Sequence, residues 1–292
     1  MEISELIKKV RKIEIRIRRL SRQLFVGGYH SAFKGRGMSF SEVRQYQFGD
    51  DVRAIDWNVT ARTGEAYIKI FEEEREQTLL LLADLSGSTF FGAQGPDKRE
   101  LIAEICAVLA FSAEANNDKV GLLLFADKPL LYIPPKKGRQ HVLRIVRELL
   151  QTEGEGLGTD LAGALRFARN VLKQRSVCVL LSDFQAADYE KSIAVMARRH
   201  ELIGIHCWDA LERDLPDLGP IRWRDAESGA EHWIDSSDPA QRRRYREIFD
   251  QRQARTAQNF RKSGADLVSI RSDQPYAPHL LQLFERRSSH AI

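Results

Sequence analysis

The strongest constraint on the fold is a pair of uninterrupted apolar runs, each of which leads into an aspartate. Residues 79–83 lead into DLSGS at 84–88, and residues 177–181 lead into Asp183, with a single GTD segment at 158–160 between the two runs. Apolar runs of this length without polar alternation are typical of strands buried on both faces, as in parallel sheets covered by helices. The chain is therefore expected to build at least part of its core around such a sheet.

Strand and helix patterns alternate from residue 66 onward. This alternation predicts an α/β fold with a doubly wound, mostly parallel sheet of the Rossmann-like kind. The segment 129–133 follows a tight turn and is expected to pair antiparallel with the strand before it. The expected strands are 77–84, 119–126, 129–133, 176–183, 201–208 and 266–271, the expected helices are 98–116, 138–151, 160–174, 188–199, 239–263 and 276–287, and 220–234 is expected to form a hairpin.

The N-terminal part of the chain has a different pattern. Apolar residues spaced by three and four predict a basic amphipathic helix over 2–25, which docks with a solvated basic face, engages a partner or lies peripherally on a membrane. Residues 27–75 are rich in glycine and mixed in charge, and they predict a small, irregular subdomain of mostly β or extended structure. The expected domains are thus 1–26, 27–75 and an α/β domain over 76–292.

Charged side chains are dense within the 27–75 subdomain. Asp50, Asp51, Arg53, Asp56 and Arg62 are expected either to form an ion-pair network that docks the subdomain or to provide a surface for a partner. Aromatic residues interleaved with arginine and lysine are also a pattern of nucleic-acid platforms. The neighbouring acids cancel much of that positive charge, so no nucleic-acid partner is expected.

Composition limits the compartment and the class of protein. The formal net charge is +4, and the three cysteines are widely spaced without metal-ligand spacing, which indicates reduced thiols. No apolar run approaches the roughly 20 residues that a membrane-spanning helix needs. The N-terminal residues lack the apolar core of a secretory leader. We therefore expect a cytoplasmic protein without an integral membrane segment.

Oxygen-bearing side chains gather at the expected ends of the two apolar strands. Asp84, Ser86 and Ser88 point the same way if the segment is extended, and the strand that ends at Asp183 is the expected neighbour across the switch point of the sheet. That arrangement places Asp183 opposite Asp84, and the glycine-rich loop before Thr159 can bring its hydroxyl to the same edge. Each residue also has a simpler explanation, because serine, threonine and aspartate commonly cap helices and turns.

This donor set consists of carboxylates and hydroxyls, without sulfur or imidazole. Such a set favours Mg²⁺, with Mn²⁺ or Ca²⁺ as alternatives, over zinc or copper. Two carboxylates and three hydroxyls leave an electrophilic ion with an open position, which a carboxylate from a partner can fill. The DLSGS segment is also not needed as a helix cap, because Asp97 already precedes the next expected helix.

The pattern resembles the metal-ion-dependent adhesion site of von Willebrand factor A-type domains, which has the form Asp-x-Ser-x-Ser, then Thr, then Asp. Asp84, Ser86, Ser88, Thr159 and Asp183 match each position in turn. The resemblance implies that the first four are the principal metal ligands. It also implies that Asp183 acts through water.

The upstream segment is similar to the domain-of-unknown-function 58 family, whose members join such a segment to an A-type domain. The similarity is carried by GRG at 35–37, FSEVRQY at 40–46, GDDVRAIDW at 49–57, TAR at 60–62 and FEEER at 71–75. It implies association with a MoxR-type AAA+ ATPase. Many relatives carry N-terminal transmembrane helices, and these are not expected in this chain.

These inferences predict a metal-dependent protein-interaction adaptor rather than an enzyme. The partner would be a MoxR-type AAA+ ATPase acting on the assembly or maturation of client proteins, with a client that offers an acidic residue to the metal. The alternative is a Mg²⁺-dependent phosphotransferase or phosphatase with Asp84 as nucleophile. That chemistry usually uses a second acid two residues later, where Ser86 stands, and a lysine beside the later aspartate, and no lysine is obviously paired with Asp183 in the sequence.

Overall fold

The structure is a computed structural model that describes residues 39–72, 76–90, 97–152, 158–224 and 230–290. The described residues fall into two units, one within Lys34–Gln77 and the other from Thr78 onward. The amphipathic helix expected over 2–25 lies outside the described residues. No helix in the described parts of the chain is both long and apolar enough to cross a membrane.

The larger unit is built on a six-stranded sheet with the order β10–β7–β6–β3–β4–β5. All neighbouring strands run parallel except β5, which pairs antiparallel with β4. The sequence-based prediction of a mostly parallel sheet is therefore confirmed. The strands are β3 (Thr78–Asp84), β4 (Lys119–Phe125), β5 (Pro129–Lys136), β6 (Val177–Ser182), β7 (Glu201–Trp208) and β10 (Asp266–Arg271).

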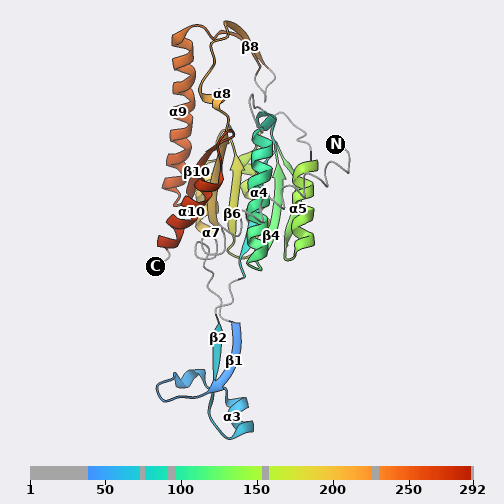
Figure 1. Cartoon of the computed structure of the whole chain (residues 1–292), viewed down its shortest axis with the longest axis vertical. Coiled ribbons are helices and arrows are strands. Elements are labelled where there is room, and N and C mark those ends of the chain that lie inside the picture. Colours follow the sequence, from blue (N-terminus) through green and yellow to red (C-terminus); the bar gives the residue numbers. More distant parts are fainter. Residues whose placement is uncertain (1–38, 73–75, 91–96, 153–157, 225–229, 291–292) are drawn as a thin grey trace. The chain divides into compact units, whose positions relative to one another are not determined.

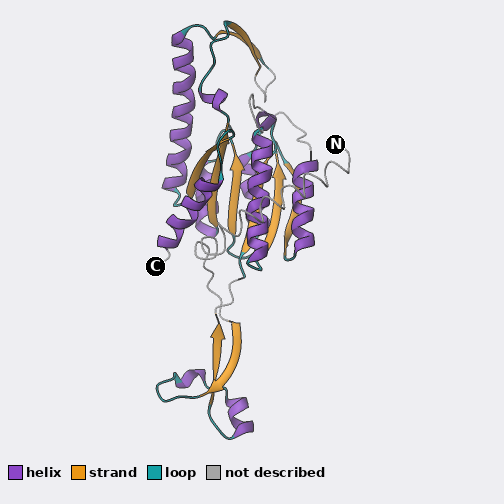
Figure 2. Ribbon diagram, in the orientation of Figure 1, coloured by secondary structure: helices purple, strands orange, loops and turns teal. Residues whose placement is uncertain are grey.

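Helices cover both faces of this sheet, as Figures 1 and 2 show. On one face α4 (Lys98–Ala115), α5 (Arg139–Gln151) and α10 (Ala277–His290) pack on alternate residues of the strands. On the other face α6 (Leu161–Val171), α7 (Glu190–Arg199) and the C-terminal end of α9 (Pro239–Lys262) pack on the intervening residues. The fold is therefore doubly wound, as predicted.

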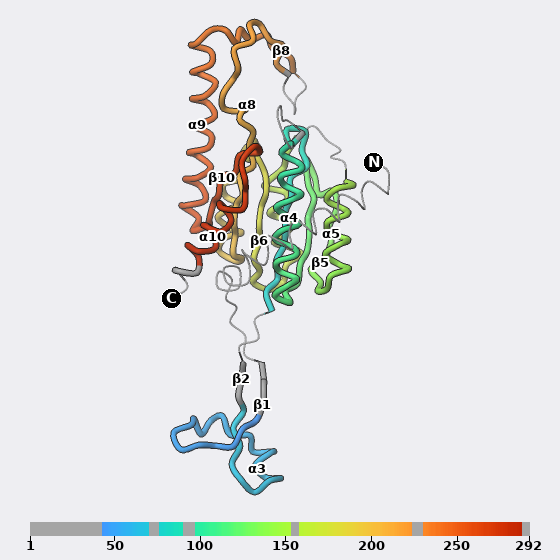
Figure 3. The backbone as a smooth tube through the Cα atoms, in the orientation of Figure 1, coloured from blue at the N-terminus to red at the C-terminus, as the bar shows by residue number. Residues whose placement is uncertain are grey.

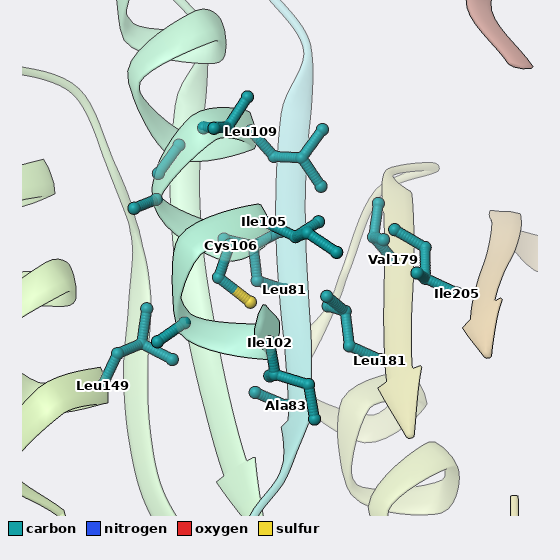
Figure 4. Close-up of a cluster of buried hydrophobic side chains, with 14 of the residues drawn as sticks. Leu81, Ala83, Ile102, Ile105, Cys106, Leu109, Leu149, Val179, Leu181 and Ile205 are labelled. Atoms are coloured by element: carbon teal, nitrogen blue, oxygen red, sulfur yellow. The ribbon is translucent and has the colours of Figure 1, made fainter. Parts of the chain in front are cut away.

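The central strand shows why its apolar run is uninterrupted. Leu79, Leu81 and Ala83 face the core on the α4 side, whereas Leu80 and Leu82 face the opposite core. Figure 4 shows Ile102 and Ile105 of α4 directed at Leu81 and its neighbours. A strand that buries both faces has no solvent side on which to place polar residues.

Between β7 and β10 the chain forms an insertion of helices and a hairpin, residues 209–265, which we call the excursion. It comprises α8 (Ala210–Arg213), an antiparallel hairpin of β8 (Pro220–Arg224) and β9 (Glu231–Asp235), and then α9. Figure 3 shows α9 starting beside this hairpin and running back along the sheet. Trp223 packs edge-on against Tyr245, with ring centroids 5.5 Å apart, and joins the hairpin to α9.

The smaller unit is an antiparallel pair, β1 (Ser39–Gln45) and β2 (Tyr67–Glu72), joined by the 3₁₀ turn η1 (Val52–Ala54) and by α3 (Trp57–Thr63). Its acids act locally. The Asp50 carboxylate accepts two hydrogen bonds from the Arg44 guanidinium, at 2.8 and 2.7 Å. Asp51 and Asp56 cap η1 and α3 through their side chains. The predicted docking role of this acid-and-arginine cluster remains a prediction.

Candidate functional site

Asp84 is the last residue of β3 and is fully buried. It lies where β3 meets β6, the point at which the connections of the sheet diverge to opposite sides and at which α/β sheets form binding crevices beyond the carboxyl ends of their strands. We call this end of the sheet the carboxyl edge. The first residue of the candidate set thus lies at the position that the fold favours for a ligand.

The strand register corrects one expectation. Ala83 pairs with Leu181, so the residue across from Asp84 is Ser182, and Asp183 lies one residue beyond the end of β6. The Ser182 hydroxyl donates a 2.6 Å hydrogen bond to Asp84 Oδ2. The prediction that Asp183 stands opposite Asp84 was wrong by one residue, because β6 ends at Ser182, one residue before the strand end that we expected.

The loop after β3 turns its hydroxyls toward each other. Asp84 Oδ1 accepts the Ser86 amide at 2.9 Å, and the Ser86 and Ser88 hydroxyl oxygens lie 3.2 Å apart. Both serines are buried, and the short 3₁₀ turn η2 (Gly87–Phe90) follows. The Leu85 amide bonds the Phe125 carbonyl at 2.8 Å and so fixes the loop to β4. Asp84, Ser86 and Ser88 therefore form one compact group.

A buried lysine lies at the site, which our sequence analysis missed. The Lys98 ammonium lies 2.8 Å from Asp183 Oδ2 and 2.7 Å from Glu212 Oε1, with a side-chain exposure of 1%. The expectation that no lysine pairs with Asp183 was wrong. Lys98 is the first residue of α4, and a basic residue there opposes the helix dipole, so its position was a signal available in the sequence.

Glu212 connects this pair to the excursion after β7. It is the third residue of a capping box in α8, where its Oε2 accepts the Asp209 amide at 2.8 Å. Its Oε1 also accepts the Gln185 side-chain amide at 2.7 Å. The Asp-x-x-Glu spacing of residues 209–212 is the sequence signature of such a box, so Glu212 too was within reach of sequence reasoning.

Thr159 also comes to the carboxyl edge. The backbone amide of the next residue, Asp160, bonds the carbonyl of Ala126 just beyond β4, at 2.8 Å. The cap of α6 is Asp160, whose side chain accepts the Gly163 amide. The alternative that Thr159 serves as the helix cap is therefore wrong.

The electrostatics of the two aspartates differ. Burial raises the pKa of Asp84 to about 7, and the neighbouring Asp183 carboxylate acts in the same direction. Burial alone would also raise the pKa of Asp183, but the Lys98 ammonium more than offsets this and holds it below its usual value. Burial raises the pKa of Glu212 as well, and it lowers the pKa of the nearby His206 to about 4. Of these acids, Asp84 is the one without a salt bridge among the described residues.

The donor chemistry fits a hard cation at the Asp84 side of this cluster. A fully buried carboxylate flanked by serine hydroxyls offers oxygen ligands and excess negative charge, which is what Mg²⁺ requires. In the described ranges, no group of three or more His, Cys, Asp or Glu side chains is arranged to hold a metal ion. A cation site here therefore depends on hydroxyl ligands.

Comparison with known proteins gives a family and several relatives. The family model described as "Protein of unknown function DUF58" matches residues 42–255. "Uncharacterized protein Rv1480" of Mycobacterium tuberculosis is 30% identical over 292 residues, covering 99% of this chain and 92% of the relative. "Uncharacterized protein YeaD" of Bacillus subtilis is 30% identical over 138 residues, covering 47% of this chain and 31% of the relative.

Two solved structures are similar in fold. The conserved hypothetical protein BatB from Bacteroides thetaiotaomicron is 16% identical, with a TM-score of 0.49, and the match covers 73% of this chain and 99% of that protein. The SpRpn10 VWA domain is 14% identical, with a TM-score of 0.42, and the match covers 72% of this chain and 95% of that domain. Both TM-scores lie below 0.5, so these two likenesses carry no weight in assigning a site.

Proposed function

Because this chain belongs to the family described as "Protein of unknown function DUF58", whose name assigns no activity, we propose its function from the geometry of the site. The chain acts as a metal-dependent protein-interaction module. It binds Mg²⁺, or Mn²⁺ or Ca²⁺ in its place, through Asp84, Ser86, Ser88 and Thr159, with Asp183 in a supporting role.

The observation that carries the proposal is the unbalanced charge at Asp84. Its carboxylate is fully buried and has the Ser182 hydroxyl and the Ser86 amide as hydrogen-bond donors. A buried carboxylate without a cation is costly, which is why burial raises the pKa of this group to about 7. A bound divalent cation removes that cost and uses the adjacent hydroxyls as ligands.

The chain's own residues explain why the site suits recognition. Asp84 fixes the position of the cation, and the Ser86 and Ser88 hydroxyls add neutral oxygens without cancelling its charge. A cation held in this way supplies Lewis-acid attraction for an anionic ligand at its open position. A glutamate or aspartate on a partner protein provides such a ligand.

The partner class follows from the family resemblance and is part of the proposal. We propose a MoxR-type AAA+ ATPase as the partner machine and, as the client, a protein that offers an acidic residue, with assembly or maturation of the client as the outcome. The cytoplasm is the compartment in which such a partnership would operate.

The test is binding of a purified MoxR-type ATPase to the immobilised full chain in Mg²⁺ and in EDTA. Binding in Mg²⁺ is expected to disappear in EDTA and in Asp84→Ala. The matched control is Asp127→Ala, which removes an exposed aspartate just beyond β4 and should leave binding unchanged. Equal binding in Mg²⁺ and EDTA would overturn the metal-bridged mode of interaction.

Lys98 makes the phosphotransferase alternative worth testing, since a lysine beside the later aspartate is part of that chemistry. Lys98 is fully buried and is held by two carboxylates, so its ammonium does not face a substrate phosphate. We expect no release of phosphate from a generic aryl phosphate in Mg²⁺. If the protein releases phosphate and Asp84→Asn abolishes this turnover, the phosphotransferase or phosphatase alternative would be favoured over the interaction function.

A further inference from the structure

Lys98 lies in the buried polar cluster at the carboxyl edge. Its ammonium bonds Asp183 and Glu212 at 2.8 and 2.7 Å. Asp84 lies with the hydroxyls of Ser86 and Ser88, and the Ser88 hydroxyl also interacts with Asp183. The cluster thus contains three buried or largely buried carboxylates and a single lysine.

The two carboxylates that bond Lys98, Asp183 and Glu212, already have donors on both oxygens. Asp183 Oδ2 bonds Lys98, and its Oδ1 accepts the Gln185 amide at 3.1 Å. Glu212 Oε1 bonds Lys98 and the Gln185 side chain, and its Oε2 accepts the Asp209 amide. Moving either carboxylate onto a cation would break a charge-assisted hydrogen bond to Lys98, whose side chain is only 1% exposed, which is costly.

We propose that Lys98 acts as a positioning residue that keeps Asp183 away from the cation, so that the cation has one protein carboxylate, Asp84, and binds tightly only when an external carboxylate completes it. This inference rests on the cation site proposed above. It deepens that proposal, because it makes the metal and the acidic partner depend on each other.

The physical basis is the number of charged ligands. The affinity of oxygen sites for divalent cations rises with the number of carboxylates that they contribute. A site with one carboxylate and several hydroxyls holds a divalent ion weakly, and an added carboxylate supplies the missing charge. By linkage, whatever factor the external carboxylate adds to metal affinity, the metal adds to carboxylate affinity.

Glu212 keeps this arrangement in place. It is fixed by the α8 capping box, and its Oε1 accepts a 2.7 Å hydrogen bond from the Lys98 ammonium. Two carboxylates around one amine also retain the positive charge. Burial alone would lower the pKa of Lys98, but Asp183 and Glu212 raise it above its usual value.

The experiment measures Mn²⁺ affinity of the full chain by calorimetry, with and without sodium acetate as the probe carboxylate. The informative variant is Lys98→Met/Glu212→Gln, which removes one positive and one negative charge and so keeps the net charge of the cluster. It frees Asp183 from the lysine. The matched control is Arg213→Met/Asp250→Asn, which deletes a half-exposed ion pair with an N–O distance of 2.9 Å between α8 and α9.

In the wild type, we expect weak Mn²⁺ binding that acetate strengthens at least tenfold. The Lys98→Met/Glu212→Gln variant should bind Mn²⁺ at least tenfold more tightly without acetate, and acetate should then add little. The control pair should behave as the wild type does. Folding of each variant is checked by its far-ultraviolet circular dichroism and by a cooperative thermal transition.

The possible failures are distinguishable. Equal Mn²⁺ affinity in the wild type and the folded double variant would overturn the role of Lys98 while leaving the cation site intact. Binding in the double variant alone would support that role and overturn the cation site of the natural protein. If the double variant does not fold, Glu212→Gln is used, and a gain in its acetate-free Mn²⁺ affinity would contradict the inference, since Lys98 then holds Asp183 alone.

Discussion

The two ends of the central sheet carry clusters of similar composition but different balance. At the carboxyl edge, Lys98 lies between Asp183 and Glu212, with Asp84 beside them, and the lysine and both aspartates are almost inaccessible to water. At the amino end, Arg287 of α10 bonds Glu201, the first residue of β7, and Asp266, the first residue of β10. There the side-chain exposures are 15%, 27% and 47%.

The difference shows which cluster serves the fold and which calls for a ligand. At the amino end, water solvates the carboxylate charge that Arg287 does not neutralise. The cluster therefore needs no ligand, and it joins α10 to two strands. At the carboxyl edge, water cannot solvate the charge in this way, and Asp84 has no salt bridge among the described residues to offset the cost of its ionisation. Four predictions, from the largest expected effect to the smallest, test this contrast.

The first prediction compares the two cations. Lys98→Met should lower the free energy of unfolding by about 3–5 kcal/mol, because it leaves buried carboxylates without their partner. Arg287→Met should cost only about 1 kcal/mol, since its partners are partly solvated. Urea unfolding at neutral pH in EDTA measures both, and equal losses would remove the distinction between the two ends.

The second prediction concerns pH. The pKa of Asp84 is raised to about 7 in the folded state, against roughly 3.9 when unfolded. As pH rises, Asp84 therefore loses its proton in the unfolded state before it does so in the folded state. Its contribution to the free energy of unfolding is fully present below about pH 4 and is lost as pH rises through 7. The loss amounts to about 4 kcal/mol in metal-free protein.

The free energy of unfolding in EDTA is measured as a function of pH for the wild type and for Asp84→Asn, and the second curve is subtracted from the first. His206, whose pKa burial lowers to about 4, titrates in the same range with the opposite sign and is common to both proteins. The difference curve should therefore fall between pH 4 and 7. A flat difference would contradict the burial of an uncompensated charge at Asp84.

The third prediction adds the cation. Mg²⁺ at 100 times its dissociation constant should stabilise the wild type by about 2.7 kcal/mol. Asp84→Ala should lose this gain, whereas Arg287→Met should retain it, because the amino-end cluster has no part in the site. Thermal unfolding at increasing Mg²⁺ measures the gain, and stabilisation of Asp84→Ala equal to that of the wild type would place the ion elsewhere.

The fourth and smallest effect concerns one hydroxyl. Ser182→Ala removes the 2.6 Å hydrogen bond to Asp84 Oδ2 and should cost about 1–2 kcal/mol. It should also raise the pH midpoint of the Asp84 transition, because that bond favours the charged carboxylate. Ser272→Ala removes a 2.7 Å bond to Asp209 at the same edge and should leave the midpoint unchanged. An equal shift of the midpoint in both variants would mean that the effect comes from a general change at the carboxyl edge and not from the bond between Ser182 and Asp84.

Most of the fold was predictable because its signals are local. The apolar run at 79–83 indicated a strand buried on both faces, and the start of α4 was readable from its cap, Asp97, which accepts the Glu100 amide at 2.7 Å. The helix α8 was missed because it is a single turn, too short for an apolar period. The smaller unit was expected to be mostly β or extended, which agrees with β1 and β2, but the bounds of these strands were not predicted because their pattern is irregular.

The sequence by itself determined the order of strands and helices, the apolar runs and the position of Asp84, Ser86 and Ser88 at the end of a central strand, because periodicity and strand ends are properties of neighbouring residues. Tertiary structure alone decided that Ser182, not Asp183, faces Asp84, and that Lys98 lies between Asp183 and Glu212. The two contacts of Lys98 join residues 85 and 114 positions apart. They depend on strand register and on the packing of α4 and α8, which no local pattern encodes.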